Sequence, residues 1–183
     1  MAALAEVKSL IMNSFFFLDA ARCGFENIEK AKSLTSSAHA IAFPLMEKES
    51  YLEEVAPYLF AQEKGLVEWY VQNGWYDSWG YFFESDATFE RCLTHFQRMA
   101  IKREAGKAGR YFRFYDPRVL KKILPGYEQQ QVIDFFGPVG KFIVEGDVYD
   151  ESIEFSQKNG TLTQKKVTAN LLINENSSKV LIS

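Results

Sequence analysis

The sequence predicts a mixed α+β fold (α/β in the broad sense), with helices packed against a central mixed β-sheet. The chain has 183 residues, which is long enough to bury a core without disulfides or metals. Short apolar runs of strand length alternate with segments whose apolar residues recur every three or four positions. After residue 147 the composition becomes polar and β-leaning. We therefore expect a main domain at residues 1–147 and a C-terminal β-rich tail, a short β-hairpin, at 148–183.

The middle of the chain carries the clearest element signals. Apolar residues at helical spacing define one face of a helix: Phe89, Cys92, Leu93, Phe96, Met99 and Ala100. Ser85, Asp86 and Thr88 are candidate caps for its first turn. Asp116-Pro117 predicts the start of a second helix, because a short acidic side chain can cap the first turn and proline fits the first helical position. The predicted elements are a strand at 79–84, a helix at 87–101, a strand at 110–115 and a helix at 117–124.

The first third of the chain has weaker signals. The continuous apolar run at 15–20 is typical of a strand buried on both faces. Pro44 restricts a strand at 39–45 to an edge or an end. Asn73-Gly74 predicts a left-handed cap after a short helix. The remaining expectations are an amphipathic helix within 1–14, a helix at 27–34, a loop or helical turn at 47–54, a strand at 57–62 and a helix at 66–72.

The last third is expected to add one helix and several strands. Gly137-Pro138 ends a helix predicted at 127–136, and an apolar run predicts a strand at 141–144. Asn159-Gly160 lies between two β-leaning runs, which is a strong hairpin signal. A second hairpin is expected over 174–178.

Composition and charge exclude several classes of protein. The net charge is −3 and the basic residues are dispersed, which argues against a nucleic-acid binder. The two cysteines, Cys23 and Cys92, are too few for a disulfide framework and fit a reducing compartment. No apolar run approaches the ~20 residues of a membrane span, and the first residues do not resemble a secretory signal. We expect a cytoplasmic protein that binds neither membrane nor nucleic acid and needs no cofactor.

Acidic residues follow several predicted strands, and they are the sharpest candidate catalytic pattern. These residues are Asp19, Glu84, Asp86, Asp116 and Asp147. If they converge, three or four carboxylates could hold Mg²⁺, as in a metal-dependent hydrolase. The alternative is that Asp86 and Asp116 cap helices while the others pair with arginines. The sequence contains no phosphate-binding loop and no nucleophile-elbow motif, and His39 and His95 have no metal-ligand spacing.

Aromatic residues make up 15% of the chain, and all three tryptophans lie between positions 69 and 79. Tryptophan and tyrosine are favoured anchors of protein interfaces, so Trp75, Tyr76 and Trp79 are candidate partner-binding residues. The alternative is a core corner where a helix, a loop and a strand meet.

Several blocks of the sequence together resemble the DUF4123 family. The central blocks are W-Y-D-S-W-G-Y-F-F-E-S-D-A-T-F-E at 75–90, R-Y-F-R-F-Y-D-P-R-V-L at 110–120 and F-F-G-P-V at 135–139. Shorter blocks precede them in the expected order: F-F-L-D-A-A-R at 16–22, F-P-L-M at 43–46 and A-P-Y-L at 56–59. The resemblance covers about residues 14–146.

The resemblance implies a function in protein binding. Members of this family are adaptor chaperones of the bacterial type VI secretion system, which hold an effector toxin and help to load it onto the VgrG spike. This implies that the chain is not an enzyme and that its partners are an effector toxin and VgrG. The motif residues Glu84, Asp86, Arg113, Asp116 and Arg118 are then expected to hold the scaffold. The alternatives are the metal-dependent hydrolase and an immunity protein that neutralises a toxin.

Overall fold

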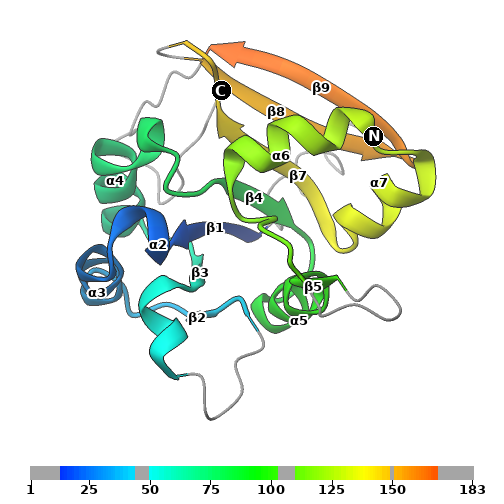
Figure 1. Cartoon of the computed structure of the whole chain (residues 1–183). Helices are drawn as coiled ribbons and strands as arrows, with labels where there is room; N and C mark the ends of the chain where they lie inside the picture. The colour runs from blue at the N-terminus through cyan, green and yellow to red at the C-terminus, as the bar shows by residue number, and fades with distance from the viewer. Residues whose placement is uncertain (1–12, 44–49, 103–109, 149–150, 169–183) are drawn as a thin grey trace.

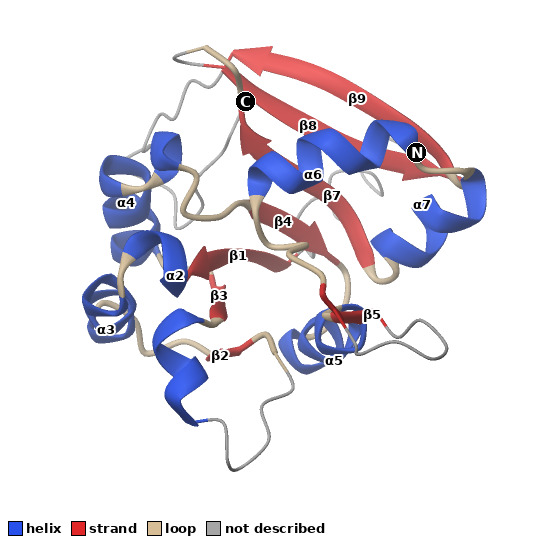
Figure 2. Cartoon of the chain, viewed as in Figure 1, coloured by secondary structure: helices blue, strands red, loops and turns tan. Residues whose placement is uncertain are grey.

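The computed structural model describes residues 13–43, 50–102, 110–148 and 151–168, and it has a seven-stranded sheet at its centre (Figures 1 and 2). The strand order is β2-β3-β1-β4-β7-β8-β9, and each neighbouring pair is antiparallel. The strands are β1 Asn13–Asp19, β2 His39–Ile41, β3 Pro57–Ala61, β4 Phe82–Ser85, β7 Val139–Glu145, β8 Glu151–Lys158 and β9 Thr161–Thr168. The mixed α+β class is confirmed, while the expected mixed sheet is antiparallel in every described pairing.

Helices cover both faces of the sheet. The α-helices are α2 Ala20–Cys23, α3 Phe25–Ser33, α4 Lys64–Asn73, α5 Phe89–Met99, α6 Pro117–Ile123 and α7 Gln129–Phe136. The 3₁₀ helices are η1 Ser50–Val55, η2 Trp75–Asp77 and η3 Leu124–Gly126. One core lies between the sheet and α5, α6 and α7, and the other lies between the sheet and α2, α3, α4 and η2.

Strand β1 supplies both cores, as its continuous apolar sequence predicts. Phe15 and Phe17 point into the core with α5 to α7, and Phe16 and Leu18 point into the core with α2 to α4. This alternation follows from the two-residue period of a strand. The ring of Phe17 meets that of Phe96 edge to face at 4.7 Å, which ties α5 to the centre of the sheet.

Most predicted elements are confirmed within a few residues. The clearest case is the β8–β9 hairpin, whose turn residues Asn159 and Gly160 both have positive φ angles, 52° and 79°. Gly160 is also pressed against Gln129 of α7, so a side chain there would collide with the helix. The hairpin continues the central sheet at its β7 edge (Figure 1). The division of the chain at residue 147 stays a prediction.

Two local predictions are wrong. The expected central strand at 110–115 reduces to β6, Arg110–Tyr111, which pairs only with β5, Ile101–Lys102, in a separate two-stranded sheet. Gly74 ends α4 with φ −136°, and the left-handed residue is Ser78 at φ 57°. Gly74 is needed for space, because a Cβ there would overlap the Trp79 ring. The expected helix within 1–14 and second hairpin over 174–178 lie largely or wholly outside the described residues.

Candidate protein-interaction site

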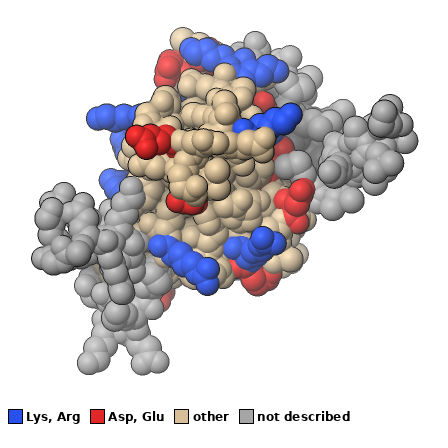
Figure 3. Space-filling view, turned by 90° about the vertical axis from the view of Figure 1, so that its right-hand side faces the viewer, with Lys and Arg blue, Asp and Glu red and all other residues tan. Residues whose placement is uncertain are grey.

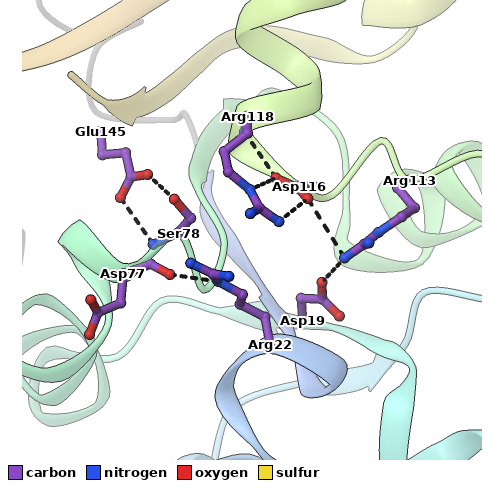
Figure 4. A network of polar contacts seen from close by, with 8 residues as sticks. All are labelled: Asp19, Arg22, Asp77, Ser78, Arg113, Asp116, Arg118 and Glu145. Carbon is purple, nitrogen blue, oxygen red and sulfur yellow. Dashed lines mark hydrogen bonds and ion pairs between the residues drawn. The ribbon is translucent and has the colours of Figure 1, made fainter. Parts of the chain in front are cut away.

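Three of the five motif residues, Arg113, Asp116 and Arg118, meet at a polar junction where β1 ends and α6 begins (Figure 4). Asp19 is the last residue of β1, and its Oδ2 accepts a hydrogen bond of 2.8 Å from Nη2 of Arg113. The same nitrogen lies 3.6 Å from Oδ2 of Asp116. The junction therefore joins the sheet to the segment that leads into α6.

The start of α6 explains the position of Asp116. Asp116 has extended backbone angles, and its Oδ1 accepts the backbone N–H of Arg118 at 3.0 Å. The Arg118 guanidinium then binds the same carboxylate through two nitrogens, at 2.9 and 2.7 Å. Asp116 is thus an N-cap, as the Asp-Pro sequence predicts.

Burial and charge act in opposite directions on the two aspartates. Burial raises the pKa of Asp19 above its ordinary value, although the hydrogen bond and charge of Arg113 oppose the change. Burial also acts to raise the pKa of Asp116, but the hydrogen bonds and charge of Arg118 outweigh it and hold that pKa below its ordinary value. The cost of burying the charged carboxylate is therefore better compensated at Asp116 than at Asp19.

Glu145 forms a second part of the junction. Its carboxylate accepts the hydroxyl of Ser78 and, at 3.2 Å, the backbone N–H of Ser78. Beside it, Nε of Arg22 donates to the carbonyl of Asp77 at 2.9 Å. These contacts fix the loop after η2 against β7 and α2. Burial raises the pKa of Glu145, and the two bonds from Ser78 oppose this change.

The junction buries its acids and exposes its bases. Asp19, Asp116 and Glu145 are almost fully buried, whereas the side chains of Arg113 and Arg118 are 47% and 48% exposed. Chemically, this arrangement offers arginine N–H donors to carboxylates or carbonyls of a partner, while the buried carboxylates hold the arginines in place.

The three aromatic candidates separate in the structure. Trp75 is fully buried and packs on Tyr70 and Phe82, so the prediction that its side chain contacts a partner is wrong. Trp79 is half-buried and lies against Trp69. Tyr76 is 39% exposed. Only Tyr76 and Trp79 therefore reach the surface.

The five predicted carboxylates do not converge on one site: only Asp19 and Asp116 come together, and they share Arg113. Glu84 lies on β4 beside Lys141, at 3.4 Å, and Asp86 is exposed. Asp86 is also not the cap of α5: Thr88 accepts the backbone N–H of Arg91 in that role. Among the described residues, no three His, Cys, Asp or Glu side chains form a group that could hold a metal ion. Glu84, Asp86 and Asp116 therefore lack the geometry of the hydrolase alternative.

A groove between α5, the segment after β6, and α7 is a feature that sequence reasoning missed. Its volume is about 240 Å³, and it is lined by Met99, Phe112, Tyr127, Gln131, Asp134 and Phe135. Phe112 falls within the strand predicted at 110–115, but β6 ends at Tyr111 and Phe112 lines the groove. Its other residues come from distant segments, so only the tertiary fold brings them together.

The chain thus forms an α+β fold in which buried carboxylates and half-exposed arginines meet at one polar junction. The sequence matches the family described as Domain of unknown function (DUF4123) over residues 18–133, which is more than half of the chain. The chain therefore belongs to the DUF4123 family. No curated protein and no solved structure matches it significantly. In the part of the chain that the structure describes, no helix is both long and apolar enough to cross a membrane.

Proposed function

We propose that this protein is a cytoplasmic adaptor chaperone that binds a type VI secretion effector toxin and helps to load it onto the VgrG spike. The observation that carries the proposal is the DUF4123 match, which includes the W-G-Y-F-F-E-S and R-F-Y-D-P-R blocks. The adaptor role itself comes from the resemblance. It involves no catalysis and no cofactor.

The arrangement of the motif residues is consistent with this role. In the interior, Asp19 joins β1 to the segment before α6, Asp116 caps α6, and Glu145 joins β7 to the loop after η2. Arg113, Arg118 and Tyr76 remain accessible at the surface, and arginine and tyrosine are enriched among residues that dominate binding energy. A scaffold that is rigid before binding loses little conformational entropy when a partner docks.

Co-expression with the proteins encoded by the neighbouring genes, among which the proposal expects a toxin and a VgrG protein, tests the proposal. We expect the chain to co-purify with the toxin and with VgrG, and the bound toxin to keep its enzymatic activity. A chain that binds neither protein contradicts the proposal. A chain that binds the toxin and abolishes its activity would instead be an immunity protein.

A further inference from the structure

The groove beside α7 has an apolar floor and a polar wall. Met99, Phe112, Tyr127 and Phe135 contribute the floor: the first three are partly buried and pack against the core between the sheet and α5 to α7, and Phe135 is a buried member of that core. The rings of Phe112 and Tyr127 lie 6.3 and 5.8 Å from that of Phe135. The floor is thus largely aromatic, and its partly buried side chains, Met99, Phe112 and Tyr127, leave it partly open.

The walls of the groove are fixed in position. Nε2 of His95 on α5 lies 2.9 Å from the carbonyl oxygen of Phe135 on α7, so the two helices are joined directly. At the other end, Nε2 of Gln129 donates to the carbonyl of Asn159 at 2.8 Å, which holds α7 to the hairpin turn. The groove is therefore formed before any partner arrives, and a partner need not order it.

The size of the groove fits one large side chain. Small-molecule sites usually have volumes of about 300–1,000 Å³ and enclose most of their ligand. This groove has about 240 Å³ and is bordered by exposed residues of α7. Protein interfaces commonly place a single aromatic or long aliphatic anchor in a pocket of this kind.

The charge on the α7 wall is negative. Asp134 lines the groove, and its Oδ1 accepts a hydrogen bond from Gln130 at 2.8 Å within the same helix. Glu128 precedes the helix, and Gln129–Phe136 contains no lysine or arginine. Figure 3 shows the side of the molecule that lies to the right in Figure 1, where α7 is found: residues other than Lys, Arg, Asp and Glu cover its middle, and charges of both signs lie around them.

We propose that this groove binds a polypeptide segment of a partner protein that inserts one large apolar side chain beside a lysine or arginine. The apolar side chain contacts Phe112, Tyr127 and Phe135, and the cation meets Asp134 at the wall. The inference rests on the proposed function, because it assigns one of the surfaces that an adaptor would use. It also identifies the partner chemistry that this surface selects.

Selection of short random peptides displayed on phage, against the full chain, tests the inference. We expect the enriched peptides to share an aromatic residue or leucine next to lysine or arginine. A synthetic peptide of this type should bind Asp134→Lys about tenfold more weakly than the unmodified protein, because the new lysine repels the peptide's cation where Asp134 attracts it. Replacing the peptide's cation by glutamate should restore part of the binding to Asp134→Lys. Glu54→Lys, at another exposed acid that lies outside the groove, is the matched control and should bind as the unmodified protein does.

Three results would overturn the inference. Enriched peptides could lack the pattern, or they could bind Asp134→Lys and Glu54→Lys equally well. Sedimentation could instead show that Asp134→Lys splits a dimer of the unmodified chain, which would make a second copy the occupant. If peptides bind as expected but no toxin or spike complex forms, the adaptor role fails and the groove stands. If those complexes form but Asp134→Lys leaves peptide binding unchanged, the groove fails and the adaptor role stands.

Discussion

Two aromatic regions of this protein differ in what covers them. On one face of the sheet, Tyr70, Trp75 and Phe82 form a corner that α4 and η2 close completely. On the other face, Phe112 and Tyr127 remain half-buried beside the groove. Both regions are rich in large rings, and the sequence draws attention to the buried one because its tryptophans are close together. The comparison shows that density of aromatic residues along a sequence does not indicate exposure.

The largest expected effect comes from the corner. Trp75→Ala removes a fully buried ring and should lower the free energy of unfolding by about 3–5 kcal/mol. The neighbouring change Tyr76→Ala should lower it by about 1 kcal/mol or less, because that side chain is partly exposed. Urea denaturation followed by circular dichroism measures both. Equal losses at the two positions would show that the corner is not closed in solution.

The junction should give an intermediate effect. Asp116→Ala removes the N-cap of α6 and the partner of Arg118, which should cost about 1–3 kcal/mol, given that the guanidinium is half-exposed. Asp147→Ala is the control, because Asp147 is 67% exposed and pairs with Lys121 at the surface, so it should cost about 1 kcal/mol or less. We also expect Asp116→Ala to affect stability more than partner binding. Unchanged stability together with lost binding would reverse the roles that we assign to this residue.

The link between the groove walls should depend on pH. Burial lowers the pKa of His95, so the folded state favours the neutral ring, which donates from Nε2 to Phe135. A histidine whose pKa is lowered by folding stabilises the folded state fully above the pKa of the unfolded state, about 6.5. This stabilisation is lost as the pH falls from there through the pKa of the folded state. Between pH 8 and pH 5.5 the unmodified protein should therefore lose more stability than His95→Gln does.

Denaturation curves at the two pH values measure this difference. If His95→Gln shows the same pH dependence as the unmodified protein, the His95 link does not titrate as the structure implies.

The smallest effect on stability should come from the groove wall. Asp134→Asn changes an exposed side chain that contacts Gln130 of its own helix, so the free energy of unfolding should change by about 0.5 kcal/mol or less. The same measurement on Tyr127→Ala should show a larger loss, because that ring packs on Phe135. A large loss for Asp134→Asn would indicate a structural role for the wall.

Sequence patterns predicted the elements whose causes are local. Asp116-Pro117 fixed the start of α6, Asn159-Gly160 fixed the β8–β9 turn, and the apolar run of β1 fixed its burial on both faces. Each depends on a few neighbouring residues, because capping, turn geometry and strand period act over short distances.

Features that depend on distant segments were not predictable in this way. Residues 110–115 have strand-like composition, yet only Arg110–Tyr111 is a strand, because its partner β5 follows directly on α5, whose C-cap is Ala100. The exposure of Trp75 is decided by α4 and the sheet, and the groove is assembled from α5, the segment after β6 and α7. No local sequence pattern predicts these long-range contacts.

Hydrogen–deuterium exchange on the chain, alone and assembled with its toxin and spike, tests the central claim most directly. The claim is that the protein binds partners through its open surfaces while the aromatic corner remains closed. We predict slower exchange in α7 in the complex and unchanged exchange in Leu66 to Tyr70 of α4. The proteolytic peptide that contains Tyr76 reports separately on the exposed surface at η2. Unchanged exchange in both α7 and η2, or a change confined to α4, would contradict the account.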